Sequence, residues 1–114
     1  MSDPMTVWFI SGDLVFASRV RAAAEDAGCD FKLSMRPPDD DVAKPIGWVI
    51  LDLSTRSGLT EDIAGSCESA CPNAKLIAYG PHVQVTRLSA ARQAGISTVL
   101  TRGQFDAMLA SMFV

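Results

Sequence analysis

The sequence predicts an α/β domain with a five-stranded parallel sheet between two layers of helices. Five short apolar runs alternate along the 114-residue chain with stretches whose apolar residues recur at helical spacing, and the connections are short. This alternation is typical of a parallel sheet that helices cover on both faces. Right-handed crossovers and five strands favour the flavodoxin-like strand order 2-1-3-4-5, a three-layer αβα sandwich formed by residues 1–114 as a single domain.

The central run, Trp48 to Ser54, predicts the strand around which the others are arranged. Four apolar residues lead directly into Asp52, and such a run is typical of a strand buried on both faces. We expect Leu51 to point into the core. Because ligands bind beyond the carboxyl ends of parallel strands, Asp52 is expected at the functional edge of the sheet.

Residues 6–34 predict a strand, a helix and an edge strand. Thr6 to Ile10 is an apolar run, and Ser11-Gly12-Asp13 is expected to turn the chain into a helix that starts at Leu14. One helical face is formed by Phe16, Val20, Ala23, Ala24 and Ala27. Gly28 fits the left-handed position that ends a helix. Cys29 to Ser34 then predicts a short strand at the sheet edge.

Met35 to Pro45 predicts an irregular connection. The adjacent Pro37 and Pro38 forbid a regular strand, and Asp39-Asp40-Asp41 follows them. Two interpretations are open. The segment is either a solvated loop in place of a full helix, or an acidic docking segment for a basic partner.

The second half of the chain repeats the pattern after a loop at Thr55 to Gly58. A helical face with Leu59, Ile63, Cys67, Ala70 and Cys71 precedes a strand at Ala74–Tyr79. The next helix is expected to end at Gly95 and to point Val85, Leu88, Ala91 and Ala94 inward. A strand at Ile96–Leu100 leads to a last helix, from about Gly103, that buries Phe105, Met108, Leu109 and Met112.

Composition restricts the function classes. Hydrophobic residues make up 48% and charged residues 20% of the chain, which is a globular balance. The net charge of −3 and the pI near 4.9 argue against a nucleic-acid surface. No apolar run is long enough for a membrane span, and the N-terminus lacks the features of a signal peptide. We therefore expect a cytoplasmic protein with Cys29, Cys67 and Cys71 as reduced thiols.

The strand order predicts which side chains meet at the functional edge. The residues expected beside Asp52 are Ser11, Gly12, Asp13, Tyr79, Gly80, His82, Thr101 and Arg102. Asp52 either has a binding role or is a helix cap or loop carboxylate. The sole histidine, His82, is either a cap or surface residue or a pH-sensitive residue that contacts an anion.

Other chemistries receive little support. Ser54, Asp52 and His82 lack a Gly-x-Ser-x-Gly elbow, which argues against hydrolysis. Core packing is favoured for Cys67 and Cys71, because a zinc site needs more ligands at closer spacing. The chain has no Gly-x-Gly-x-x-Gly or Walker pattern, so we expect no nucleotide or flavin.

The stretch Val49-Ile50-Leu51-Asp52-Leu53, with the preceding strand and Arg-bearing helix, resembles a response-regulator receiver domain over nearly the whole chain. The resemblance implies that Asp52 matches the phosphoacceptor aspartate of that family. Ser11-Gly12 stands where the family has an acidic pair that holds Mg²⁺, with Asp13 one place on. Tyr79-Gly80 replaces a Thr or Ser, and Thr101-Arg102 replaces a Lys-Pro. Gly80-Pro81-His82-Val83 also resembles a recurrent segment of receiver-like proteins that lack the full acidic site.

These departures predict a degenerate receiver, or pseudo-receiver. Mg²⁺ needs a nearly octahedral oxygen shell and usually more than one carboxylate, for which only Asp13 and Asp52 are candidates. Phosphoryl transfer needs its charge neutralised, and an arginine such as Arg102 is not interchangeable with a lysine. We expect a stand-alone regulatory protein-binding module without catalysis, cofactor or metal. The alternative is a functional receiver of two-component signalling, phosphorylated at Asp52 with Mg²⁺.

The last residues predict an interaction surface. Receivers commonly bind partners through the fourth helix, fifth strand and fifth helix, and the resemblance implies the same face here. Phe113 and Val114 have no obvious inner place beside the flexible side chains of Met108 and Met112. Arg87 and Arg92 are expected to form a polar rim around this patch. We expect a weak homodimer or a partner site on this face; the alternative is that Phe113 folds back on the core.

Overall fold

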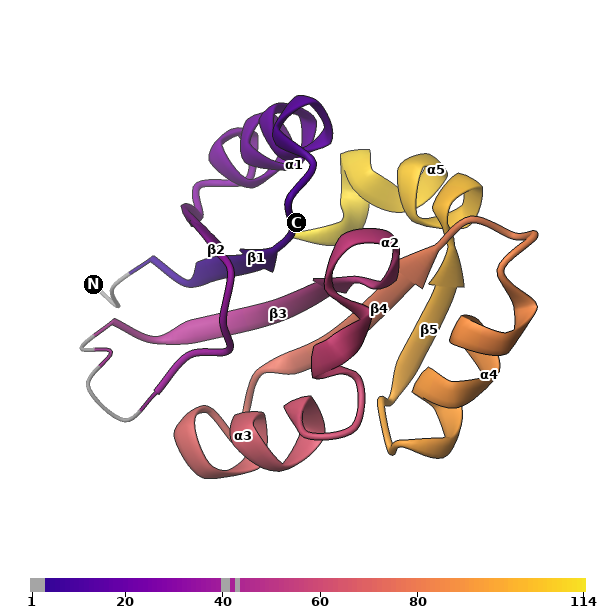
Figure 1. Cartoon of the computed structure of the whole chain (residues 1–114). Helices are drawn as coiled ribbons and strands as arrows, with labels where there is room; N and C mark the ends of the chain where they lie inside the picture. Colours follow the sequence, from indigo (N-terminus) through magenta and orange to yellow (C-terminus); the bar gives the residue numbers. More distant parts are fainter. Residues whose placement is uncertain (1–3, 40–41, 43) are drawn as a thin grey trace.

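The computed structural model describes residues 4–39, 42 and 44–114, so Asp40 and Asp41 of the acidic segment lie outside the described residues. Five parallel strands form one sheet in the order β2-β1-β3-β4-β5 (Figure 1). The strands are β1 (Thr6–Ile10), β2 (Asp30–Ser34), β3 (Ile46–Asp52), β4 (Lys75–Gly80) and β5 (Thr98–Thr101). The predicted fold class and strand order are confirmed.

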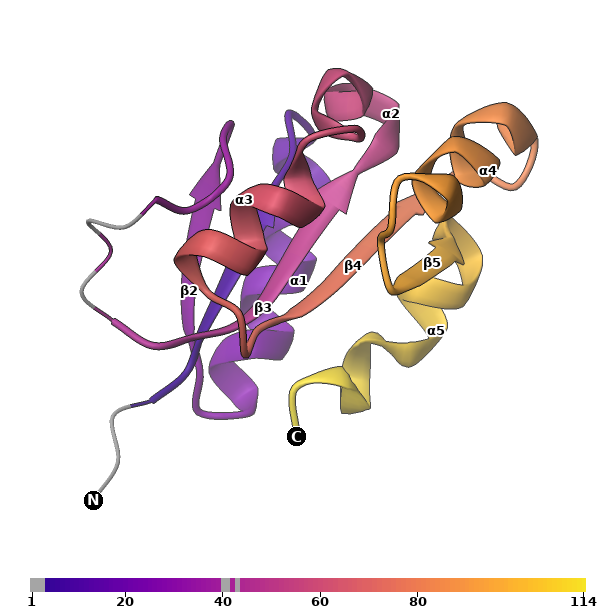
Figure 2. The ribbon, with the colours of Figure 1, turned by 90° about the horizontal axis from the view of Figure 1, so that it is seen from below.

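Helices cover both faces of the sheet. They are α1 (Leu14–Asp26), α2 (Leu53–Arg56), α3 (Ile63–Ala70), α4 (Val85–Gln93) and α5 (Arg102–Met112), with a 3₁₀ turn at Ser57–Leu59. Figures 1 and 2 show α1 and α5 on one face and α2, α3 and α4 on the other. Gly28 and Gly95 follow α1 and α4 with φ of 79° and 90°, the left-handed conformation that glycine adopts most readily.

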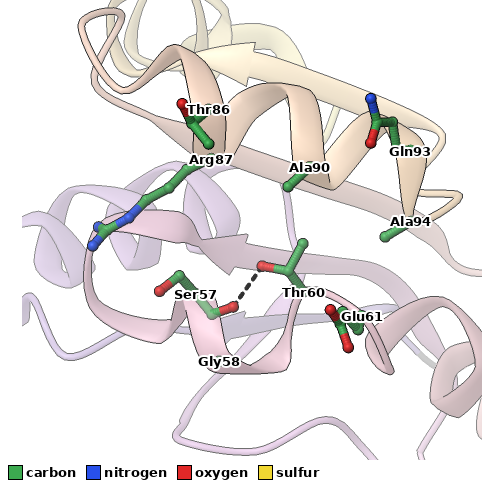
Figure 3. Close-up of a pocket in the computed structure, with 9 residues that line it drawn as sticks. All are labelled: Ser57, Gly58, Thr60, Glu61, Thr86, Arg87, Ala90, Gln93 and Ala94. Carbon is green, nitrogen blue, oxygen red and sulfur yellow. Dashed lines mark hydrogen bonds between the residues drawn. The ribbon is translucent and has the colours of Figure 1, made fainter.

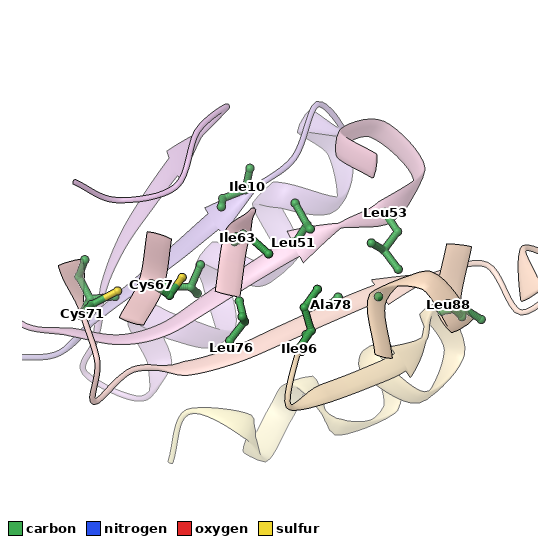
Figure 4. Close-up of a cluster of buried hydrophobic side chains, with 13 residues drawn as sticks. Ile10, Leu51, Leu53, Ile63, Cys67, Cys71, Leu76, Ala78, Leu88 and Ile96 are labelled. Carbon is green, nitrogen blue, oxygen red and sulfur yellow. The ribbon is translucent and has the colours of Figure 1, made fainter. Parts of the chain in front are cut away.

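Two hydrophobic clusters lie on opposite faces of the sheet because successive side chains of a strand alternate. Val49 and Leu51 of β3 belong to the cluster under α3 and α4, where Leu51 is fully buried (Figure 4). Ile50 belongs to the cluster under α1 and α5. Burying one such aliphatic side chain stabilises a fold by about 1.5–3 kcal/mol.

Cys67 and Cys71 pack in the cluster under α3, as expected for core residues. Burial, together with a smaller contribution from the neighbouring Cys71, raises the pKa of Cys67 to about 12. Burial also raises the pKa of Cys71. Both thiols are therefore held in the neutral form, in which they act as small apolar side chains.

The central strand ends earlier than its sequence predicted. β3 stops at Asp52, and Leu53–Arg56 forms α2, so the prediction of a strand to Ser54 and a loop at Thr55–Gly58 was wrong. Asp52 has extended backbone angles, and its side chain accepts a hydrogen bond from the Ser54 amide, which begins a helix. Leu53 remains fully buried because the turn places it against Gly80: a Cβ built on Gly80 would lie 3.4 Å from that of Leu53.

Two inward positions were also predicted wrongly. Val85 is 67% exposed and Met108 is 46% exposed, whereas Leu88 and Leu109 are buried on the same helices. A short helix buries only a narrow stripe against the sheet, and the apolar residues beside that stripe remain in solvent.

The C-terminus settles the alternatives for Phe113. Its side chain is 4% exposed and meets the Trp48 ring edge-on, with 5.1 Å between the ring centroids and 75° between the ring planes. Phe113 therefore folds back on the core, and the expectation of an exposed Phe113 was wrong. Val114 is 93% exposed. In the described part of the chain, no helix is both long and apolar enough to cross a membrane.

Replacing Phe113 with alanine should lower the free energy of unfolding by about 3 kcal/mol, because it removes a buried ring and leaves a cavity beside Trp48. Removing Val114 alone should change it by less than about 0.5 kcal/mol. Urea unfolding followed by Trp fluorescence measures both. Equal stability of the two variants would show that Phe113 does not belong to the core.

Candidate functional site

The candidate site lies where the strands reach their carboxyl ends. Ile10 and Leu51 are register partners, so Ser11 and Asp52 come next to each other at the ends of the central pair of strands. Ser11 is fully buried and Asp52 is 2% exposed. The sequence placed both at this edge, and the structure brings them into contact.

Three donors hold the Asp52 carboxylate. Ser11 Oγ donates to Oδ2 at 2.7 Å, and Thr55 Oγ1 donates to the same oxygen at 2.9 Å. The Ser54 backbone N–H donates to Oδ1 at 2.9 Å. Hydrogen bonds to an ionised acceptor are stronger than neutral ones. Asp52 is therefore a helix cap that also links the loop after β1 to α2, and a helix cap is one of the two interpretations that the sequence left open.

The same hydroxyl groups also accept hydrogen bonds from the loop after β1. Ser11 Oγ accepts from the Asp13 N–H at 2.9 Å, and Thr55 Oγ1 accepts from the Gly12 N–H at 2.9 Å. Each hydroxyl thus donates to Asp52 and accepts from the backbone. We call Ser11, Asp52 and Thr55 the hydroxyl–carboxylate network.

Asp13 and Arg102 form a second, more exposed pair. The Asp13 side chain caps α1 by accepting from the Phe16 N–H at 3.0 Å. Arg102 Nη2 lies 3.4 Å from the other Asp13 oxygen, and its guanidinium stands 4.7 Å from the centre of the Phe16 ring. Arg102 is therefore directed to Asp13 and Phe16.

Tyr79 and Gly80, at the end of β4, have packing roles. Tyr79 is 2% exposed and stacks with Phe9 and Phe105, with centroids 6.1 and 4.5 Å away. Burial raises the pKa of Tyr79 far above its usual range, and the nearby charge of Asp52 raises it further. Gly80 is buried beside Leu53.

Thr101 and His82 lie at the margin of the site. Thr101 caps α5: its Oγ1 accepts from the Gln104 N–H at 3.2 Å, and Gln104 Oε1 accepts from the Thr101 N–H at 2.9 Å. His82 is exposed and lines a surface hollow of 380 Å³ together with Arg102, Phe16, Arg19, Pro81, Gly103 and Asp106.

Thr55 was not among the site residues predicted from the sequence, and Arg87 was predicted on a different surface. Thr55 was assigned to a loop, although a hydroxyl three residues after an N-cap aspartate was an available signal. Arg87 was expected on the rim of the α4–β5–α5 face. Its Nη1 instead donates to the carbonyl oxygens of Leu53 at 3.3 Å and Ser54 at 3.4 Å, which attaches α4 to α2.

The resemblance to receivers implies a Mg²⁺ site at this edge. The oxygen atoms that the structure places there do not fit a Mg²⁺ shell. Mg²⁺ needs about six oxygen ligands in octahedral geometry. Here both Asp52 oxygens accept protein hydrogen bonds, and both Asp13 oxygens face the Phe16 amide or Arg102. Among the described residues, no three His, Cys, Asp or Glu side chains gather as a metal site would require.

We expect Asp52→Ala to lower the free energy of unfolding by about 2–4 kcal/mol, because three donors lose a charged acceptor. This is comparable to the cost of about 2–5 kcal/mol expected for Leu51→Ala. Thr55→Val should cost about 1 kcal/mol.

The matched control is Ser54→Ala, since Ser54 holds Asp52 through its backbone and the change should cost less than about 0.5 kcal/mol. Chemical denaturation of the four variants gives the comparison. An Asp52→Ala variant as stable as the parent chain would contradict a structural role for this carboxylate.

Comparisons with known proteins agree with this architecture. No family model matches the chain, and no curated protein matches it. Among solved structures, a CheY-like response regulator from Mesorhizobium loti has a TM-score of 0.69 at 18% identity, covering 98% of this chain and 100% of its own. The phosphorylated cyanobacterial phytochrome response regulator RcpA has a TM-score of 0.72 at 7% identity, covering 96% and 91%. A receiver domain protein from Methanospirillum hungatei has a TM-score of 0.66 at 10% identity, covering 94% of each chain. The chain therefore has the CheY-like fold of response-regulator receiver domains.

Proposed function

We propose that this chain is a degenerate receiver-like domain that serves as a regulatory protein–protein interaction module and is not switched by aspartyl phosphorylation. One observation carries the proposal: the Asp52 carboxylate is 2% exposed and both of its oxygens already accept hydrogen bonds from the chain. An attacking carboxylate must reach its phosphodonor in line, and Asp52 would first have to leave this network.

The charges around the network support the same proposal. Phosphoryl transfer needs cations on the moving oxygens. The position of the family's lysine is occupied by Thr101, whose side chain caps α5. Arg102, the next residue, is paired with Asp13 and lies over Phe16. Among the described residues, no Lys or Arg side chain forms a salt bridge or hydrogen bond with the Asp52 carboxylate, so a phosphoryl group there would add negative charge without a cationic partner in contact.

A surface for the partner is offered by the α4–β5–α5 face. At the β5–α5 part of this face, a hollow of 290 Å³ is lined by residues of β3, β4, β5 and α5: Trp48, Lys75, Ile77, Thr98, Leu100, Met108, Ser111 and Met112. Met108 is 46% exposed, and flexible methionines adapt to varied partner surfaces. We propose that this face binds a protein partner or a second copy of the chain, with Arg92 rather than Arg87 available at its rim.

Incubation with acetyl phosphate and millimolar Mg²⁺ should leave the intact mass of the chain unchanged, because Asp52 and its surroundings lack the metal ligands and free cation that the reaction needs. A receiver known to accept phosphate from this donor, treated in parallel, is the control. A one-phosphate mass increase that is lost in Asp52→Asn would establish the alternative, a functional receiver.

The double variant Ser11→Asp/Gly12→Asp provides a positive control, because it places an acidic pair where receivers hold Mg²⁺. A Cβ on Gly12 would lie 3.5 Å from Thr55 Cβ, an ordinary contact, so a side chain fits there. The added carboxylates repel Asp52, and a bound cation would relieve this repulsion. Mg²⁺ should therefore raise the melting temperature of the variant and leave that of the parent chain unchanged.

Sedimentation velocity tests the second-copy form of the partner proposal. If two copies meet through the α4–β5–α5 face, the parent chain should dimerise weakly at high concentration and Met108→Asp should remain monomeric, since a charge in an apolar interface disfavours association. Val15→Asp, a change at an exposed valine of α1, should not affect dimerisation. A parent chain that is monomeric throughout would exclude the homodimer.

A further inference from the structure

A groove lies between the 3₁₀ turn Ser57–Leu59 and α4, and none of its lining residues belongs to the hydroxyl–carboxylate network. It encloses 630 Å³, which is larger than the hollows beside His82 and Met108. Figure 3 shows its two walls, which consist of Ser57, Gly58, Thr60 and Glu61 on one side and Thr86, Arg87, Ala90, Gln93 and Ala94 on the other.

The lining of this groove can accommodate a peptide main chain. Each side chain that lines it is either small or polar. Ala90 and Ala94, one turn apart on α4, allow a backbone to come close. The hydroxyl and amide groups of Ser57, Thr86 and Gln93 can exchange hydrogen bonds with backbone N–H and C=O groups, which need partners when a peptide is bound.

Opposite charges lie toward the two ends of the groove. Arg87 stands near the end formed by Ser57, and Glu61 stands near the end formed by Ala94 (Figure 3). The hydrogen bonds that the structure gives to Arg87 all use Nη1, which donates to Leu53 O, Ser54 O and Gln84 Oε1. The remaining guanidinium nitrogens carry donors with which a carboxylate pairs well.

The length of the groove sets the length of its ligand. The wall formed by α4 and its C-cap runs from Thr86 to Ala94, nine residues that span about 12 Å along a helix. An extended peptide advances about 3.3 Å per residue, so about four residues span the same distance.

We propose that this groove binds an extended segment, about four residues long, of a partner protein, with an acidic residue at the Arg87 end and a basic residue at the Glu61 end. This deepens the proposed function, on which it rests, by assigning a second contact surface and its chemistry. Charge complementarity places the acidic and the basic residue of the segment at opposite ends of the groove. The hydrogen-bonding side chains between those ends set the chain direction of the segment, and the small residues admit its backbone.

Titration of ¹⁵N-labelled protein with capped tetrapeptides tests the proposal. The probes are acetyl-Glu-Ala-Ser-Lys-amide, the reversed acetyl-Lys-Ser-Ala-Glu-amide and the uncharged acetyl-Gln-Ala-Ser-Gln-amide. One charged order should bind about tenfold more tightly than the other, with amide shifts confined to residues 57–61 and 86–94. No saturable shift up to about 10 mM, or equal binding of both orders, would overturn the proposal.

Two variants make the test specific. Arg87→Glu/Glu61→Arg should reverse the preferred order, and unchanged preference would overturn the proposal. Because Arg87 also contacts α2, Ala90→Leu provides a second variant that fills the groove without removing a hydrogen bond and should abolish binding. Its matched control is Ala22→Leu, in the hollow between α1 and α5, which should bind as the parent chain does.

Failure of this proposal is distinguishable from failure of the proposed function. The peptide titrations contain neither phosphodonor nor Mg²⁺, and they report on residues 57–61 and 86–94. The proposed function is tested by the intact mass of the chain after treatment with acetyl phosphate. If no peptide binds and Asp52 stays unphosphorylated, the groove proposal is wrong and the proposed function still holds.

Discussion

The buried charge of Asp52 is the constraint on which the edge of the sheet depends. An ionised carboxylate without partners in an apolar interior costs more than most folds have in net stability. Ser11, in the loop after β1, and Ser54 and Thr55, in α2, provide the donors. That loop and α2 are consequently fixed to each other, and the carboxylate that would react in a receiver acts here as the acceptor that holds them.

The effect of this network extends to α4. Asp52 begins α2, and the first carbonyl groups of α2 accept hydrogen bonds from Arg87. Leu53, carried by the same turn, fills the space beside Gly80 and joins the cluster that contains Leu88 of α4. The position of α4 is therefore set by contacts with the segment that follows Asp52. The same helix forms one wall of the groove beside the 3₁₀ turn.

This arrangement relates the proposed function to the shape of the surface. Under the proposed function, a module whose central carboxylate is already satisfied acts through the binding of partners. The two surfaces proposed for such binding differ in the residues that they offer. The hollow beside β5 and α5 includes the exposed Met108, whereas the groove beside α4 has Arg87 and Glu61 toward its two ends. In that proposal the two surfaces bind different segments of one partner or two separate proteins.

The sequence by itself determined the strands, their order, the burial of Leu51 and the location of Asp52, because apolar periodicity directly records which faces a parallel sheet buries. Tertiary structure decided the contacts between segments that are distant in sequence. Ser11 reaches Asp52 through the register of β1 and β3, and Phe113 is buried only because the chain returns to Trp48. Neither contact leaves a local pattern, since one depends on the register of neighbouring strands and the other on the path of the chain end. The receiver-like position of Asp52 could therefore be predicted from the sequence, whereas its hydrogen bond from Ser11 could not.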